Sequence, residues 1–186
     1  MKRAPNSRGF SMVELMVVVA IVLLIAVVAV PNVMNTINNI RLRSMVGTVS
    51  GVMQNGRMLA IKANRQYTVR YAMLGSSSVV FVDVDGSGTP EASEPQAQLG
   101  GTIIQVAAPV GTTPLDSTTL GFPPQTGNLT FNPRGLPCTT PTNCGVGFVV
   151  YFSDQRTVGG SGSAAVSVSP AGRVKSWLWA GNKWGD

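Results

Sequence analysis

An unbroken apolar run dominates the start of the chain. Residues 15–30 are all apolar, and only Ser11 and Glu14 interrupt the apolar pattern back to Phe10. At 1.5 Å per residue, a helix over residues 10–30 is long enough to cross the hydrocarbon core of a bilayer, which is about 30 Å thick. The pattern therefore predicts a membrane-spanning helix over residues 10–30.

A second apolar pattern follows and has the spacing of an amphipathic helix. Its apolar and small residues recur mostly every three or four positions: Val33, Ile37, Ile40, Met45, Val49, Val52, Met53, Gly56 and Ala60. We therefore expect the helix to continue over residues 31–65, with Pro31 bending or locally melting it. A rod of roughly 80 Å exceeds a compact domain of this size, so half of it must lie in a membrane or among other subunits.

The chain after residue 65 is rich in Gly, Ser, Thr, Pro and Val and has the patterns of strands. Residues 66–74 alternate, which places Tyr67, Val69, Tyr71 and Met73 on one side. Further candidate strands are residues 78–84, 102–107, 128–132, 148–152, 164–169 and 173–179. No second helix is predicted. We expect an α+β fold in which the C-terminal half of the long helix packs against one antiparallel sheet formed by residues 66–186.

Composition narrows the possible functions. The chain has 186 residues, two cysteines and no histidine. The absence of histidine excludes a Ser-His-Asp or Cys-His catalytic site and the common histidine-containing zinc sites. Two cysteines cannot complete a four-thiolate site. Since no convergent set of acid, base and nucleophile is present either, we expect the protein not to be an enzyme.

The positive charge is concentrated partly at the N-terminus. The chain has 14 Lys and Arg against 8 Asp and Glu, a net charge of +6. Lys2, Arg3 and Arg8 lie within the first eight residues, and without them the count is 11 against 8, or +3. An N-terminal leader thus accounts for part of a basicity that otherwise suggests nucleic acid or membrane partners.

A short motif joins this leader to the apolar run. Residues 8–15 read RGFSMVEL, and they place Glu14 inside an apolar stretch, where a carboxylate is costly unless it finds a partner. The motif resembles the prepilin cleavage motif of type IV pilins and type II secretion pseudopilins. The resemblance implies that a prepilin peptidase cuts after Gly9 and methylates the new terminus at Phe10. It also implies that Glu14 faces the charged terminus of a neighbouring subunit, and that Pro31 lies where many pilins have a helix-breaking proline. A plain signal anchor is the alternative.

An acidic loop has the spacing of a calcium loop. Positions 1, 3, 5, 7 and 12 of that pattern are filled by Asp83, Asp85, Ser87, Thr89 and Glu94. Gly88 at position 6 allows the sharp turn that the pattern requires. Ser87 and Pro90 depart from the usual residues, and a strand rather than a helix is predicted before the loop. Two interpretations stay open, a calcium site and a solvated acidic hairpin loop.

Two cysteines flank a short polar segment. Cys138 and Cys144 are separated by five residues, TTPTN. In an exported domain we expect them to form a disulfide, which stiffens a surface loop and stabilises the fold by about 2 kcal/mol. A free thiol pair is the alternative.

The last predicted strand carries the sequence pattern most suggestive of a binding function. Residues 165–175, AVSVSPAGRVK, resemble the closing hairpin of the GspH/FimT family of minor pilins and pseudopilins. Members of FimT type that act as DNA receptors carry Gly-Arg-x-Arg there. Gly172 and Arg173 match this pattern, whereas Lys175 replaces the second arginine.

Alternation in that strand groups two cations with two indoles. It places Arg173, Lys175, Trp177 and Trp179 on one face. If that face is outside, it suits phosphate pairing and base stacking on single-stranded DNA. The alternative is that the tryptophans cover the helix or contact the next subunit.

Together these patterns predict a minor pilin or pseudopilin subunit. Its parts are a leader (1–9), a transmembrane and assembly helix (10–30), an amphipathic continuation (31–65) and a β-rich periplasmic or extracellular domain (66–186). The resemblance implies a single-pass protein of the bacterial inner membrane that is assembled into a type II secretion pseudopilus or a type IV pilus, with a structural role in fibre assembly and protein secretion. Its partners would be prepilin peptidase and other pilin subunits. A FimT-like role in DNA uptake is the alternative, and calcium is the only cofactor that the sequence suggests.

Overall fold

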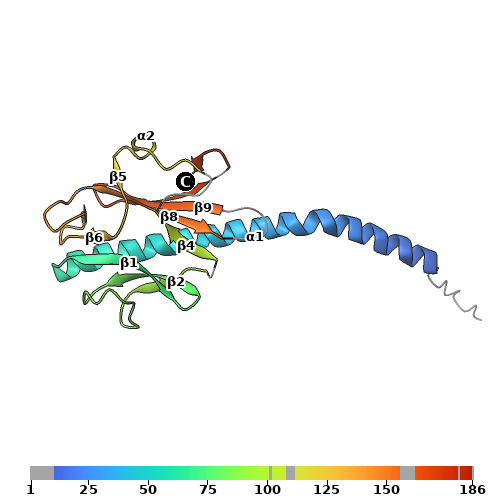
Figure 1. Ribbon diagram of the computed structural model, residues 1–186, viewed down its shortest axis with the longest axis horizontal. Coiled ribbons are helices and arrows are strands. Elements are labelled where there is room, and N and C mark those ends of the chain that lie inside the picture. Colours follow the sequence, from blue (N-terminus) through green and yellow to red (C-terminus); the bar gives the residue numbers. More distant parts are fainter. Residues whose placement is uncertain (1–10, 101, 108–111, 156–161, 180, 186) are drawn as a thin grey trace, which may run out of the picture. The chain divides into compact units, whose positions relative to one another are not determined.

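The computed structural model describes residues 11–100, 102–107, 112–155, 162–179 and 181–185 (Figure 1). The chain forms two compact units, Met1–Asn38 and Asn39–Asp186. The first helix contributes to both units.

Helix α1 spans Met12–Ala63 and passes through Pro31 without a break. Of the two effects expected of Pro31, bending or local melting, local melting is therefore wrong. A proline removes a single backbone hydrogen bond, and the turns before and after it keep their own hydrogen bonds. In the first unit the apolar side chains of α1 are exposed almost throughout. This part of the helix is long and apolar enough to cross a membrane.

In the second unit α1 buries one face and then ends in a tight turn. Its buried residues are Leu42, Met45, Val46, Val49, Ser50, Val52, Met53, Gly56 and Ala60. The amphipathic pattern is therefore confirmed from Met45 onwards, whereas Val33, Ile37 and Ile40 are exposed. Asn64 adopts a left-handed conformation, with φ of 51°, and the Arg65 N–H donates to the Ala60 carbonyl at 3.2 Å. This is the geometry of a helix C-cap, and it lets the first strand begin at Tyr67.

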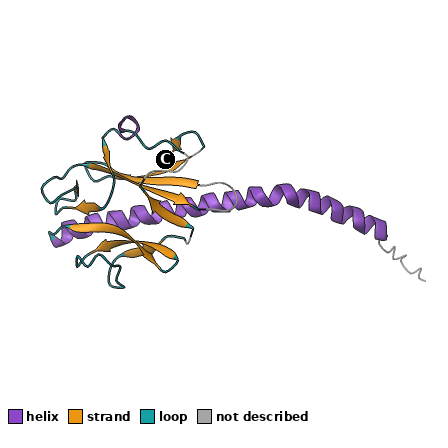
Figure 2. Ribbon diagram, viewed as in Figure 1, coloured by secondary structure: helices purple, strands orange, loops and turns teal. Residues whose placement is uncertain are grey.

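The described strands form two sheets instead of the single sheet expected (Figure 2). The first sheet has the order β3 (Gln96–Gln98), β2 (Ser77–Asp83), β1 (Tyr67–Leu74), β6 (Leu129–Phe131), β7 (Pro137–Cys138). The second has the order β11 (Trp184–Gly185), β10 (Val174–Trp179), β9 (Gly162–Val168), β8 (Gly147–Asp154), β4 (Ile103–Val106). Strand β5 (Pro124–Gln125) pairs with β8 in parallel, whereas all other described pairs of strands are antiparallel. The α+β class is confirmed, and among the described strands the chain passes from one sheet to the other three times, between β3 and β4, between β5 and β6, and between β7 and β8.

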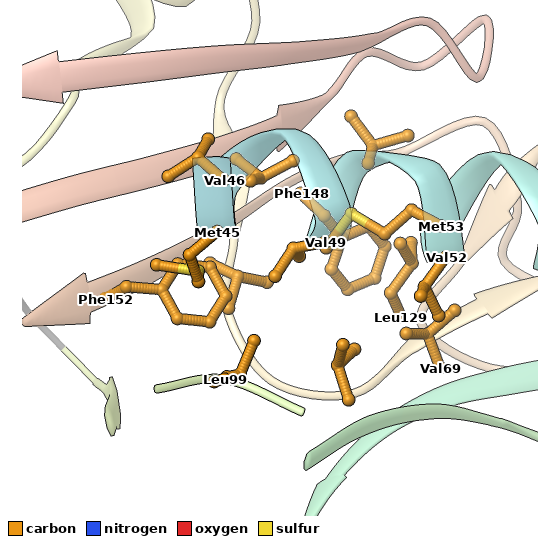
Figure 3. Packing of buried hydrophobic residues seen from close by; sticks show 14 of the residues in the cluster. Met45, Val46, Val49, Val52, Met53, Val69, Leu99, Leu129, Phe148 and Phe152 are labelled. Carbon is orange, nitrogen blue, oxygen red and sulfur yellow. The ribbon is translucent and has the colours of Figure 1, made fainter. Parts of the chain in front are cut away.

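Both sheets pack against the part of α1 that lies in the second unit (Figure 1). Val69 from the first sheet and Phe148 and Phe152 from the second join Met45 and Val49 in one buried cluster (Figure 3). The buried stripe of α1 is wide, and residues of both sheets pack against it.

Gly56 marks the closest approach of α1 to the first sheet. A Cβ atom there would lie 3.2 Å from methyl groups of both Val69 and Val82. On the other side of the helix the hydroxyls of Ser50 and Ser176 hydrogen bond at 2.9 Å. These contacts fix the level of β1 and β10 along the helix.

The outer face of the second sheet is also covered. A second buried cluster consists of Leu115, Val149, Tyr151, Ala165 and Trp177. The covering segment contains the short helix α2 (Ser117–Leu120), a helix that the sequence did not predict. The Leu115 N–H donates to the Tyr151 hydroxyl at 2.9 Å. Strand β8 is therefore buried along its whole length.

Candidate functional site

The first candidate site is the apolar surface of α1 in the first unit. Side chains along it are widely exposed, for example Leu24 at 72% and Val27 at 74%. An exposed apolar surface of this length is far larger than soluble monomers tolerate. It therefore requires lipid or other apolar helices around it.

Glu14 is the only charged residue between residues 11 and 40. It lies in the first turn of α1 and is exposed. A carboxylate in the first turn of a helix interacts favourably with the helix dipole. Glu14 nevertheless lies on an apolar surface that lipid or other helices cover, where a charge is costly. Gly9 and Phe10, the predicted processing residues, lie outside the described residues.

The acidic loop brings three of its predicted calcium ligands together. One carboxylate oxygen from each of Asp83, Asp85 and Glu94 lies within 4.8 Å of the other two. Asp83 and Glu94 are buried, and Asp85 is exposed. Ser87 and Thr89 are exposed as well, and the Ser87 hydroxyl donates to the Thr89 carbonyl at 3.1 Å.

The carboxylates of the loop already have partners within the chain. Asp83 Oδ2 accepts from Arg70 Nε at 2.6 Å, and its Oδ1 accepts from the Gly86 N–H at 2.8 Å. The two oxygens of Glu94 accept from the N–H groups of Val84 and Glu91 at 2.7 and 3.3 Å. Calcium here stays a prediction, since the ion would have to share Asp83 with the Arg70 guanidinium.

Hydrogen bonds also act on the third carboxylate. The Ser87 N–H donates to Asp85 Oδ1 at 2.9 Å, and hydrogen bonds from the Ser87 backbone and hydroxyl lower the pKa of Asp85. The loop is thus a set of carboxylates closed by backbone donors and one arginine.

The predicted disulfide between Cys138 and Cys144 is present. It closes the loop that follows β7, and the two residues also form an isolated antiparallel bridge. No cysteine of the chain is left free.

The final hairpin places its two cations differently. Arg173 is exposed at the turn between β9 and β10, and Lys175 is partly buried on β10. Lys175 Nζ lies 4.0 Å from the centroid of the Trp177 ring, a cation–π contact. Both cations line a pocket of about 260 Å³ together with Ser167 and Ser169.

The predicted pair of stacking indoles is wrong for Trp177. Alternation is right that Lys175, Trp177 and Trp179 share a face, because Val174 and Leu178 pack on the main core instead. That face is covered, however, and Trp177 is 7% exposed with its Nε1 donating to Ser167 Oγ at 2.8 Å. Trp179 is partly buried and packs edge-on against Trp184 with ring centroids 5.3 Å apart. Trp177 therefore stabilises the second cluster and is not available to stack on bases.

Arg57 is a residue whose role the sequence did not reveal. Its Nε donates to the Gly135 carbonyl at 2.9 Å, and its Nη2 donates to the Ala171 carbonyl at 3.2 Å. These carbonyls belong to turns of the two different sheets. The available signal was an arginine next to the small residue Gly56 at the edge of the apolar stripe. Arg57 thus ties the β6–β7 and β9–β10 turns to α1.

Comparison with known proteins gives matches for both parts of the chain. Residues 4–30 match the prokaryotic N-terminal methylation motif, and residues 47–172 match the type II transport protein GspH. No curated protein sequence matches the chain.

Two crystal structures of the type IV minor pilin FimU from Pseudomonas aeruginosa are similar. The first, in space group P21, shares 17% identity over 80% of this chain and 96% of that chain, with a TM-score of 0.46. The second, in space group P65, shares 18% identity over 77% of this chain and 97% of that chain, with a TM-score of 0.43.

The GspH match covers more than half of the chain and runs from residue 47 of α1 through strands β1 to β9 to the turn before Arg173. The methylation motif match covers residues 4–30, which include the apolar run up to Val30. The apolar side chains of this run are exposed in the first unit. The chain therefore belongs to the GspH family of minor pilin and pseudopilin-like proteins.

Proposed function

We propose that this protein is a structural subunit drawn from the bacterial inner membrane into a type II secretion pseudopilus or a type IV pilus. The observation that carries the proposal is the exposed apolar half of α1, which lies largely within the matched methylation motif (residues 4–30) and contains a single charge, Glu14. In the membrane lipid covers this surface, and in the fibre the helices of other subunits replace the lipid.

Glu14 sets the register of assembly in this proposal. A carboxylate in an apolar bundle is strongly unfavourable unless a cation reaches it. Cleavage after Gly9 creates an ammonium group at Phe10, four residues before Glu14. The terminus of one subunit then neutralises Glu14 of its neighbour, and a subunit in the wrong register leaves both charges unpaired.

Substitution of Glu14 tests this role. We expect Glu14→Ala to insert into the membrane normally but to be lost from sheared fibres, because the neighbouring ammonium has no partner. Ser11→Ala is the matched control, since it also replaces a polar side chain in the apolar stretch. Incorporation of Glu14→Ala at the level of Ser11→Ala would refute the role of Glu14.

The same proposal defines a topology and a processing enzyme. Residues 1–9 lie in the cytoplasm, where prepilin peptidase removes them, and the sheets lie in the periplasm. The Cys138–Cys144 disulfide supports this orientation, because disulfides persist in oxidising compartments. Loss of protein secretion in a deletion strain would assign the subunit to a pseudopilus, and loss of fibres with normal secretion would assign it to a pilus.

DNA binding is the second candidate function. It is favoured by the joint position of Arg173 and Lys175 on one pocket at the closing hairpin. With Trp177 buried, the contact would rest on phosphate pairing rather than on base stacking. Affinity should then fall steeply with salt and with Arg173→Ala or Lys175→Ala. Absence of a gel shift at low salt would eliminate this function.

A further inference from the structure

The second unit is tethered closely to the end of the apolar run. Eight residues separate Val30, the last residue of the run, from Asn39, the first residue of the unit. Eight residues span about 12 Å as a helix and no more than about 29 Å when extended. Whichever part of the second unit surrounds Asn39 must therefore stay near the membrane surface while the subunit is anchored.

The tip of the β1–β2 hairpin lies at this end of the unit. Strand β1 starts after a turn of three residues and runs back along α1, with Val69 beside Gly56. Leu74 is five residues further, about 16 Å along the strand, which equals about 11 residues of helix. The hairpin tip is thus level with Met45, close to where α1 enters the unit.

This hairpin tip is apolar and exposed. Met73 is 63% exposed and Leu74 is 49% exposed, next to a turn of Gly75 and Ser76. Moving such side chains from water into an apolar environment is favourable in free energy. Two adjacent exposed apolar residues at a hairpin tip are suited to shallow insertion between lipid headgroups.

Cations and an indole lie at the same end. Arg41 and Arg43 are exposed on α1. Arg43 lines a pocket with Asn39 and Trp179, and Lys183 is exposed in the turn that follows Trp179. Basic residues near an anionic bilayer are attracted to it, and tryptophan favours the interface. Asp154 also lies at this end, where it pairs with Gly162 across β8 and β9, but its side chain is buried.

We infer that the second unit binds the surface of an anionic bilayer through this collar, defined as Arg41, Arg43, Met73, Leu74, Trp179 and Lys183. The inference rests on the proposed membrane anchor and adds a second contact to it. The collar holds the unit against the headgroups before assembly, and the contact breaks when the subunit is drawn into a fibre.

A polarity-sensitive fluorophore tests the collar on the full chain. The probe is attached at Leu74→Cys, and both native cysteines are protected in their disulfide. The matched control is Arg134→Cys, an exposed position on the β6–β7 turn. That turn follows Phe131, which pairs with Tyr67 at the opposite end of β1. Each labelled chain is reconstituted into vesicles of phosphatidylcholine alone or mixed with phosphatidylglycerol.

We expect a blue shift and quenching by spin-labelled lipid for the probe at position 74 in anionic vesicles, and neither effect at position 134. Arg41→Gln and Arg43→Gln should each lower the equilibrium constant for binding of the second unit to the bilayer surface about fivefold, since each cation near an anionic surface contributes about that factor. Equal water exposure at both positions in anionic vesicles would overturn the collar.

The remaining outcomes are also decisive. A blue shift of equal size in neutral vesicles would overturn the role of the arginines. A chain that fails to sediment with vesicles would overturn the membrane anchor and the collar with it. A chain that sediments while its probe at position 74 stays in water would overturn the collar alone.

Discussion

Arg57 shows how one side chain holds two separate sheets in place. It is partly buried on α1 and donates to carbonyls of the β6–β7 and β9–β10 turns. Hydrogen bonds from a charged donor are stronger than neutral ones, and these two join elements more than 70 residues apart in sequence. Arg173 follows the second of these turns directly, so Arg57 also positions the start of β10.

We predict that Arg57→Ala lowers the free energy of unfolding by about 2 kcal/mol, because the carbonyls of the buried Gly135 and the exposed Ala171 both lose a charged donor. Urea unfolding of the detergent-solubilised chain measures this effect. Arg134→Ala is the control, since Arg134 is exposed on the adjacent turn and its loss should change stability by less than about 0.5 kcal/mol. Equal effects of the two substitutions would show that the hydrogen bonds of Arg57 do not stabilise the fold.

Gly172 is required by a close contact as well as by its backbone. Its φ is 79°, and a Cβ atom would lie 2.5 Å from the Gly135 carbonyl oxygen and 2.8 Å from Arg57 Nε. The first residue of the Gly-Arg pair is therefore explained by packing between two turns. No ligand is needed to account for it.

Gly172→Ala should cost about 3 kcal/mol of stability, the sum of left-handed strain and a clash with backbone. Gly121→Ala separates the two causes, because Gly121 has nearly the same φ of 78° but open space around it, and it should cost about 1 kcal/mol. Thermal melting of both variants makes the comparison. Similar melting temperatures would mean that the turns move apart without cost.

At the scale of elements, the acidic loop is an insertion between β2 and β3 that is closed by its own chain. Arg70 on β1 neutralises Asp83 at the end of β2 across the strand pair. The Arg70 guanidinium occupies the side of the loop where Asp83, the first predicted calcium ligand, lies, and its positive charge opposes a second cation.

We predict that calcium binds the wild-type loop weakly and that Arg70→Gln raises the affinity about tenfold, corresponding to about 1.4 kcal/mol less repulsion between cations. Calorimetric titration of both proteins gives the two constants. Absence of calcium-dependent heat in both would leave the loop as a solvated acidic hairpin, and equal tight binding would show that Arg70 leaves Asp83 free.

Much of the element structure follows from local patterns in the sequence. Strands β1, β2 and β10 begin and end within one residue of their predicted bounds, because alternation and flanking turn residues are local signals. The stripe of α1 from Met45 onwards was predictable from its three- and four-residue spacing. The Cys138–Cys144 bridge was predictable from the oxidising compartment expected for an exported domain.

Features set by distant contacts were not predictable. Strand β4 pairs with β8 rather than with its neighbour β3, and no local pattern specifies that choice. Alternation assigned Trp177 to the correct face of β10, but the cover on that face comes from Leu115 and its neighbours, more than 60 residues away in sequence. The roles of Arg57 and Arg70 depend on turns and strands that meet only in the folded chain.

At the scale of the whole molecule, the chain combines an exposed apolar helix with a folded unit that has its own core. The first unit supplies the surface that lipid or other subunits must cover. The second unit carries the sheets, the acidic loop and the final hairpin. We infer from these two parts that the chain leaves the membrane as a processed subunit of a fibre.

Mass spectrometry of sheared fibres shows whether the chain in them has been processed. The N-terminal peptide of the chain in the fibre fraction should begin at Phe10 and carry one added methyl group, because processing creates the ammonium that pairs with Glu14. Retention of residues 1–9 in the fibre fraction, or recovery of the chain from membranes alone, would contradict the account.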